Sequence, residues 1–276
     1  MPELPEVETI VNGLRQGSMG GPSLLNRRIE NVQLFWKRSL AIPTPEEFYK
    51  EVIGQSITAV GRRGKFLLLN LTKDYLIFHL RMSGDLMIEP YEAPIPPHHR
   101  LVLYLDEGIR LAFNDTRKFG RVWLVVDPNQ VLNHLGPEPL DPALTPLIFH
   151  ERLIHFHRKI KPLLLDQSFL AGLGNIYTDE ALFLARVYPL SSSQDISFPQ
   201  AELLLASIRK VLQEGIHHHG ASIDWVYRGG DFQNHFRVYQ RTGQPCPICG
   251  TPIQRMVVGQ RGTHFCPNCQ SVLQKA

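Results

Sequence analysis

The chain has 276 residues, of which 43% are apolar and 20% charged, the proportions of an ordinary water-soluble globular protein. No apolar run approaches the roughly 18 residues that a membrane-spanning helix needs, and the acidic start lacks the basic and apolar regions of a signal peptide. We therefore expect a cytoplasmic protein with no membrane partner. The net charge of +3 is unevenly distributed along the chain, because residues 201–276 hold 8 Lys and Arg against 4 Asp and Glu. A basic C-terminal part favours a polyanionic partner.

The chain begins with Met1-Pro2-Glu3. Removal of the initiator methionine would leave Pro2 with a free secondary amine, a nucleophile that can attack an electrophilic carbon and form a cationic iminium. An apolar i, i+3, i+4, i+7 pattern from Val7 to Leu14 predicts a helix that starts at about residue 4. The positive end of this helix would favour the neutral amine. The same residues also fit a proline that merely begins a helix.

Short apolar or alternating runs, separated by turn residues, follow the first helix and predict strands. Their density indicates an antiparallel β-sandwich or a barrel-like domain. The predicted strands are Val32–Trp36, Phe66–Leu71, Tyr75–Leu80, Leu101–Leu105, Ile109–Phe113 and Val122–Val126.

Prolines crowd residues 128–146, which indicates a linker between domains, and the periodicity then becomes helical. The predicted helices are Ile148–Phe156, Pro162–Phe169, Thr178–Arg186 and Pro199–His217. We expect an N-terminal domain over residues 1–130, a linker over 131–146, a helical domain over 147–238 and a metal-binding element over 239–276.

A glycine-punctuated turn joins two of the predicted helices. Gly172 and Gly174 allow a ligand to approach the backbone, and Asn175 can donate an amide hydrogen. Thr178 is the expected cap of the next helix, whose first N–H groups suit a phosphate. An ordinary helical corner would have the same composition.

Basic loops occur at residues 62–65, 117–121 and 260–263. The second loop contains Arg117-Lys118-Phe119, an aromatic residue flanked by cations. Such a residue can insert between bases while the cations hold the nucleic-acid backbone. Each loop taken alone would also fit solvated surface.

All four cysteines lie within 24 residues, as two Cys-x2-Cys pairs separated by sixteen residues. This spacing is typical of a four-thiolate zinc site. The predicted ligands are Cys246, Cys249, Cys266 and Cys269. Four thiolates fill the coordination shell, so the expected Zn²⁺ is structural and catalysis must come from other residues. We expect no nucleotide or organic cofactor.

Several sequence blocks together resemble formamidopyrimidine-DNA glycosylases, and the resemblance covers essentially the whole chain. The blocks are MPELPEVE, GRRGKFLLL (61–69), HLRMSG (79–84), DTRKFGR (115–121), LLLDQSFLAGLGNIYTDEALF (163–183) and RGTHFCPNCQ (261–270). The sister endonuclease VIII family shares the Pro-Glu start, the helical turn and often a zinc finger. Leu4 and the Arg-x-Phe loop favour the formamidopyrimidine branch.

The resemblance implies an α+β multidomain fold: an N-terminal β-sandwich with a leading helix, a helix–two-turn–helix domain and a C-terminal zinc finger. It implies a bifunctional DNA glycosylase and AP lyase of base-excision repair, whose partner is double-stranded damaged DNA. Such an enzyme flips out and excises oxidised purines, namely 8-oxoguanine and formamidopyrimidines. It then nicks the strand by β,δ-elimination.

The resemblance also implies roles for individual residues. Pro2 would be the nucleophile and Glu3 the general acid and base. Lys65 would hold a phosphate near the lesion, while Asn175 and Arg261 would clamp the phosphates that flank the flipped nucleotide.

The remaining implied contacts are to the DNA duplex. Met82, Arg117 and Phe119 match residues that fill the vacated stack, with Arg117 facing the orphaned cytosine. Lys161 and His98 are counted as further DNA contacts. His98 matches only the first histidine of the family's Lys-His-x-His segment.

Two features near residue 220 say less about the function. The loop that caps the extruded base in relatives should lie within 220–237. The triplet His217–His219 resembles a metal cluster, but consecutive helical residues point in different directions, so we expect it to be helix-end surface.

Two alternatives remain open. One is an endonuclease VIII-like glycosylase for oxidised pyrimidines, and the other is a non-catalytic DNA-binding zinc-finger protein. A glycosylase that acts on a single site has no need to dimerise, so we expect a monomer.

Overall fold

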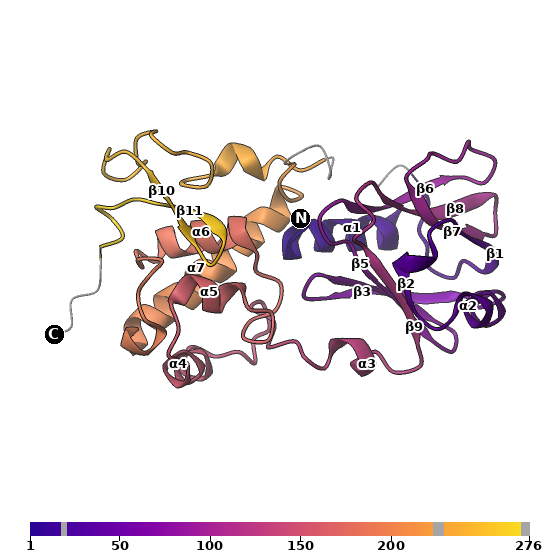
Figure 1. The fold of residues 1–276 in the computed structure, drawn as a ribbon, viewed down its shortest axis with the longest axis horizontal. Coiled ribbons are helices and arrows are strands. Elements are labelled where there is room, and N and C mark those ends of the chain that lie inside the picture. Colours follow the sequence, from indigo (N-terminus) through magenta and orange to yellow (C-terminus); the bar gives the residue numbers. More distant parts are fainter. Residues whose placement is uncertain (18–20, 223–228, 272–276) are drawn as a thin grey trace. The chain divides into compact units, whose positions relative to one another are not determined.

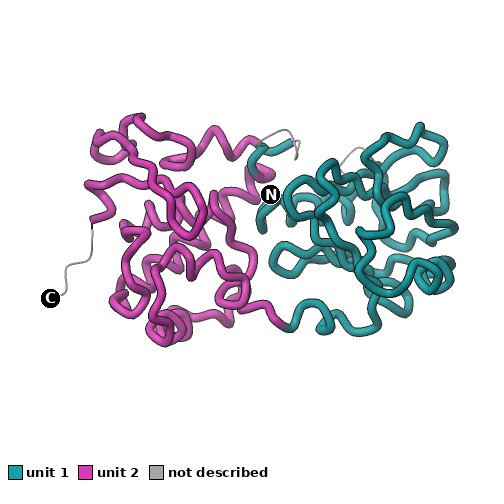
Figure 2. The backbone as a smooth tube through the Cα atoms, in the orientation of Figure 1, with its two compact units in different colours: residues 1–133, 221–230 teal, residues 134–220, 231–276 magenta. Residues whose placement is uncertain are grey.

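The computed structural model describes residues 1–17, 21–222 and 229–271. The chain forms two compact units, coloured separately in Figure 2. Unit 1 comprises residues 1–133 and 221–230, and unit 2 comprises residues 134–220 and 231–276. This division differs from the predicted boundaries in two ways. The short segment 221–230 belongs to the N-terminal unit, and the cysteine-rich element shares a unit with the helices.

Unit 1 begins with the predicted helix, α1 (Leu4–Gln16), so that prediction is confirmed. Glu3 is the N-cap, and it forms a capping box with Glu6. The helix ends at Gly17, whose φ of 79° lies in the left-handed region that favours glycine. Its apolar face is completely buried.

Two sheets follow α1 in unit 1 (Figure 1). The four-stranded sheet has the order β1-β7-β8-β6 and is antiparallel; the five-stranded sheet has the order β2-β9-β5-β4-β3, in which only the β2–β9 pair is parallel. The strands are β1 (Ile29–Leu34), β2 (Leu40–Ile42), β3 (Ile57–Arg63), β4 (Phe66–Leu71), β5 (Tyr75–His79), β6 (Gly84–Pro90), β7 (His99–Leu105), β8 (Ile109–Asp115) and β9 (Arg121–Val125). Short helices η1 (Lys37–Ser39), α2 (Pro45–Val52) and α3 (Asn129–Leu132) complete the unit.

One hydrophobic cluster lies between the two sheets and includes side chains from α1 and α2. Phe78 of the five-stranded sheet meets Phe113 of the four-stranded sheet edge-on, with ring centroids 5.7 Å apart. The predicted β-sandwich is therefore confirmed. All the predicted strands are present, whereas β2, β3 and β6 escaped prediction because they are short or end in polar residues.

Unit 2 contains α4 (Pro146–His155), α5 (Ile160–Leu165), α6 (Asn175–Leu184), η2 (Ser193–Asp195), α7 (Phe198–His217) and η3 (Phe232–His235). Helix α6 packs against α5 and α7, and α4 packs against α7. Helix α5 ends earlier than predicted because the Asp166 carboxylate accepts the N–H of Ser168 (3.0 Å), which turns the chain.

The predicted cap of α6 is wrong. The helix begins at Asn175 with Gly174 as its N-cap, and Thr178 lies inside the helix. Thr178 is fully buried and its hydroxyl oxygen lacks a hydrogen-bond partner, so it does not cap the helix.

The C-terminal element of unit 2 is a hairpin of β10 (Gln254–Val258) and β11 (Arg261–Phe265). Its two-residue turn has positive φ at both Gly259 (56°) and Gln260 (63°), as a type I′ turn requires. Strand β11 packs on α6. Among the described residues, no helix is both long and apolar enough to cross a membrane.

Candidate functional site

The N-terminal residues Pro2 and Glu3 are buried in unit 1. The carboxylate of Glu6 holds them in place, because its Oε2 accepts the backbone N–H of Glu3 at 2.8 Å. The other oxygen, Oε1, accepts the backbone N–H of Ala221 at 2.8 Å. One buried side chain thus fixes both the start of the chain and the first residue of the segment 221–230.

Lys65 lies in the turn between β3 and β4 and is only 5% exposed. Helix α1 packs on these strands in the opposite direction to β3. The Arg15 guanidinium donates to the Val60 carbonyl (2.7 Å), and Arg62 Nε donates to Glu8 Oε2 (2.8 Å). This pairing directs the start of α1 and the Lys65 turn toward the same end of unit 1.

Asp115 organises the loop between β8 and β9. Its carboxylate is buried and accepts the backbone N–H groups of Gly120 (2.7 Å) and Arg117 (3.2 Å). It also accepts the hydroxyl of Ser83, whose oxygen in turn accepts the Arg117 N–H at 3.0 Å. The turn that carries Met82 and the loop that carries Arg117 are therefore joined through one carboxylate.

Large side chains project from this joined loop pair. Met82 is 39% exposed and Phe119 is 48% exposed. The Arg117 guanidinium carbon lies 5.0 Å from the Phe119 ring centroid, a cation–π distance. His98 is exposed beside them, and its carbonyl accepts the Asp115 N–H at 2.9 Å. The structure thus brings the four predicted duplex contacts of unit 1 together.

Asn175 and Arg261 come together in unit 2 through the carbonyl of Gly262. Asn175 Nδ2 donates to this oxygen at 2.9 Å, and the adjacent Arg261 is exposed. Asn175 lies at the first position of α6, where the helix also presents backbone N–H groups. The arrangement suits a phosphate that both side chains could contact.

Lys161 does not fit its predicted contact with DNA. Its side chain is fully buried, and its Nζ lies 2.6 Å from Asp179 Oδ1 in an ion pair. The same Nζ donates to the Gly262 carbonyl at 3.1 Å. Lys161 therefore positions the hairpin that carries Arg261 and has no surface to offer a phosphate.

Two adjacent buried acids of α6 anchor backbone segments that lie far from them in the sequence. Asp179 Oδ2 accepts the N–H of His264 in β11 at 2.8 Å. Glu180 accepts the N–H groups of residues 237–239 at 2.9 Å each, and burial raises the pKa of its carboxyl. Two adjacent acids in a helix with a mostly apolar second half are the sequence signal that could have revealed them.

The four cysteines form a cluster whose sulfur atoms all lie within 4.8 Å of one another. Cys246 Sγ and Cys269 Sγ are 3.8 Å apart, and Cys249 Sγ and Cys266 Sγ are 3.5 Å apart. A tetrahedral zinc ion with Zn–S bonds of about 2.3 Å separates its sulfur ligands by about 3.8 Å. The cluster therefore fits zinc.

The thiols of the cluster differ in acidity. Hydrogen bonds from Thr251 and Asn268 lower the pKa of Cys249 to about 5. Burial raises the pKa of Cys266 and of Cys269. In the absence of metal, therefore, Cys249 gives up its proton more readily than Cys266 and Cys269 do, because the pKa of its thiol is lowered and theirs are raised.

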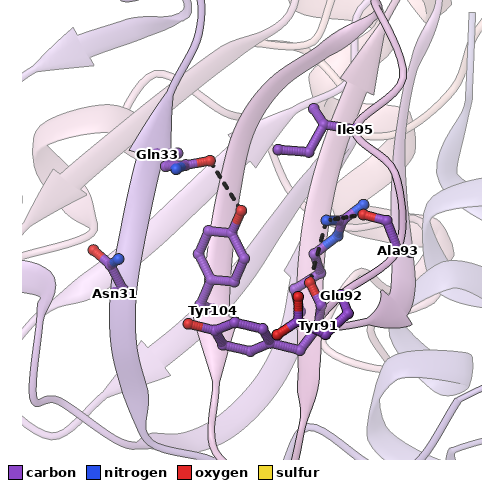
Figure 3. A pocket seen from close by; sticks show the side chains of 8 residues that line it. Asn31, Gln33, Tyr91, Glu92, Ala93, Ile95 and Tyr104 are labelled. Atoms are coloured by element: carbon purple, nitrogen blue, oxygen red, sulfur yellow. Dashed lines mark hydrogen bonds between the residues drawn. The ribbon is translucent and has the colours of Figure 1, made fainter.

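A cavity of about 280 Å³ lies on the four-stranded sheet, on the face opposite the main core (Figure 3). Tyr104 donates its hydroxyl to Gln33 Oε1 at 2.9 Å. The cationic Arg110 at its base is neutralised by Glu89 (2.6 Å) and donates to the Ala93 carbonyl (2.7 Å). The cavity contains none of the predicted site residues, and its lining includes the exposed Glu92.

Comparison with protein families gives matches along most of the chain. Residues 1–122 match the formamidopyrimidine-DNA glycosylase N-terminal domain, and residues 135–226 match the H2TH domain of the same proteins. Residues 243–272 match a zinc finger found in FPG and IleRS.

Two full-length relatives share one description. A formamidopyrimidine-DNA glycosylase of Chloroflexus aggregans is 46% identical over 282 residues, which is 99% of this chain and 100% of the relative. The protein of the same description from Protochlamydia amoebophila is 42% identical over 98% of this chain and 99% of its own length.

Solved structures of protein–DNA complexes have a fold similar to that of this chain. MutM in complex with DNA containing carbocyclic 8-oxo-G has a TM-score of 0.89 and 37% identity, over 98% of this chain and 99% of that chain. Lactococcus lactis Fpg in complex with Fapy-dG DNA has a TM-score of 0.89 and 36% identity, over 97% and 99% of the two chains.

The buried Lys161–Asp179 pair predicts a strong effect on stability. Lys161→Met should lower the free energy of unfolding by about 3–5 kcal/mol, because it leaves the Asp179 carboxylate buried without its cation. The double variant Lys161→Met with Asp179→Asn, which also removes the carboxylate charge, should recover part of the lost free energy of unfolding. Arg158→Met is the matched control, since the Arg158–Asp166 pair is exposed and should contribute at most about 1 kcal/mol. Urea unfolding measures all three, and equal losses in Lys161→Met and Arg158→Met would contradict the assignment.

The cysteine cluster predicts a zinc affinity that rises with pH. Cys266 and Cys269 must lose their protons to bind the ion, so acid competes with zinc. Competition with a chromogenic chelator between about pH 6 and about pH 8 measures this dependence. A zinc affinity that stays constant over this range would show that the two thiols are already ionised in the free protein.

Proposed function

Because the chain belongs to the formamidopyrimidine-DNA glycosylase family, we propose that it excises oxidised purines, namely 8-oxoguanine and formamidopyrimidines, from double-stranded DNA and then cleaves the strand. Support for the substrate class comes from the similar structures, which hold 8-oxo-G and Fapy-dG DNA. The single observation that carries the proposal is the buried Pro2–Glu3 start held by Glu6.

The reaction requires that the damaged nucleotide leave the duplex, because its sugar carbon is inaccessible inside the stack. Extrusion costs a few kcal/mol. The exposed Met82, Phe119 and Arg117 are suited to offset this cost by filling the vacated space. Arg117 carries the donors that would pair with the orphaned cytosine.

The chemistry starts at the amine of Pro2 once Met1 has been removed. The nitrogen lone pair attacks C1′, the bond from C1′ to the base breaks, and the base leaves with a proton. Glu3 protonates O4′ as the sugar ring opens, which leaves a C1′ iminium on Pro2. The iminium acidifies the C2′ hydrogen, so its loss expels the 3′ phosphate and a second elimination expels the 5′ phosphate.

Phosphate contacts hold the flipped nucleotide for this sequence of steps. Lys65, in the turn between β3 and β4, supplies a cation, and Asn175 and Arg261 supply further donors. We propose that one zinc ion in the cysteine cluster stabilises the element that carries Arg261 and takes no part in the chemistry. The enzyme needs no other cofactor and acts as a monomer.

Borohydride trapping tests the proposed intermediate. A duplex with one 8-oxoguanine opposite cytosine should give a covalent protein–DNA band on a denaturing gel, and the cross-linked peptide should contain Pro2. A band with thymine glycol DNA alone would instead assign the endonuclease VIII-like activity. No band with either duplex, from protein whose Met1 is removed and whose zinc is bound, would favour a non-catalytic DNA-binding protein.

Substitution of Pro2 separates chemistry from binding. Pro2→Gly should lose most base excision, because a primary amine replaces the secondary amine that forms the iminium directly. Its affinity for damaged duplex in a gel-shift titration should stay within about twofold, since no phosphate contact is lost. Excision equal to that of the unaltered protein in a steady-state assay would exclude Pro2 as the nucleophile.

A further inference from the structure

A second group of metal-ligand side chains lies in unit 2, apart from the cysteines. His218, Asp231 and His235 each place a ligand atom within 4.8 Å of the others. Among the residues that the structure describes, this group and the cysteine cluster are the ones with three or more such side chains in reach of a single ion.

The three side chains come from two segments that the backbone holds together. The N–H of Asp231 donates to the carbonyl of His218 at 3.0 Å, and the N–H of Phe232 donates to the carbonyl of Gly220 at 3.0 Å. Phe232 is fully buried and stacks on Tyr177 of α6 at 5.2 Å. The end of α7 and η3 are therefore fixed relative to each other before any ion binds.

The side chains are already partly oriented toward one another. His218 Nδ1 lies 2.9 Å from Asp231 Oδ1, and the rings of His218 and His235 are stacked with centroids 3.8 Å apart. Ligands of a tetrahedral zinc ion with bonds of about 2.0–2.1 Å are about 3.3 Å apart. The stack must open by a rotation of the imidazoles, which is inexpensive because His235 and Asp231 are exposed.

The ligand set determines the kind of ion. Two imidazoles with one carboxylate suit zinc, nickel or copper and are poorly matched to calcium or magnesium, which prefer oxygen ligands. Three protein ligands leave a position for water, so binding should be weaker than at the four-thiolate cluster. The exposed position gives an ion direct access from solvent.

We propose that His218, Asp231 and His235 form a second, solvent-accessible site for a divalent transition ion such as Zn²⁺. The ion would join the end of α7 to the start of η3. The chain leaves unit 2 after the first of these and returns to it just before the second, because residues 221–230 belong to unit 1. This inference is independent of the proposed excision activity, because it depends only on contacts within unit 2.

Metal stoichiometry tests the proposal on the full chain. Zinc-loaded protein dialysed against Zn²⁺ should hold two ions per chain, one in the cysteine cluster and one in the second group. Titration calorimetry with Zn²⁺ should show one weaker event after the cysteine cluster is filled. Ring resonances of His218 and His235 should shift together as this event saturates. One ion per chain throughout the titration would overturn the proposal.

Variants locate the second ion. His235→Ala and Asp231→Asn should each weaken the second event by about tenfold or more, as expected when a ligand or its close partner is lost. His217→Ala is the matched control: it is an exposed neighbour at the same helix end that is not part of the group. Equal weakening in His217→Ala, or an unchanged second event in His235→Ala, would refute the site. An unchanged melting temperature confirms that each variant is folded.

Discussion

Buried carboxylates that accept backbone N–H groups hold the loops on which the candidate site depends. Glu6 holds the N-terminus and Ala221, Asp115 holds the loop of Arg117, and Asp179 holds β11, the strand that begins with Arg261. Hydrogen bonds to a charged acceptor contribute about 1.5–3 kcal/mol each, and a loop so fixed loses little entropy when it meets a ligand. Burying a carboxylate without hydrogen bonds costs free energy, so each acid and the loop whose N–H groups it accepts depend on each other.

The features that follow from hydrophobic periodicity and residue spacing could mostly be predicted from the sequence. The first helix, the sandwich strands and the long helix α7 carry regular apolar patterns, and the structure has them close to the expected bounds. The cysteine spacing predicted a cluster whose sulfur separations fit zinc. These features are local, because each depends on residues that are neighbours along the chain or on the same face of one element.

Contacts between distant segments could not be predicted in the same way. Thr178 has the chemistry of a cap, but packing placed it inside α6 and left the cap to Gly174. Lys161 looks like a phosphate contact by charge, yet its partner Asp179 lies 18 residues away and draws it into the interior. The partners of His218 are equally remote, since Asp231 is 13 residues further along the chain. The sequence shows that a charged side chain is present. Only the fold determines whether that side chain forms an ion pair inside the protein or remains accessible to a ligand.

The cysteine cluster bears on the position of Arg261, which is proposed to contact a phosphate. The buried apolar cluster around the cysteines is small, and it depends on Phe183 of α6 for its packing. The hairpin that carries Arg261 is therefore fixed on one side by the cysteine cluster and on the other by Lys161 and Asn175 at the Gly262 carbonyl. Because a displacement of about 1 Å is enough to weaken an oriented contact severely, the position of Arg261 requires both supports at once.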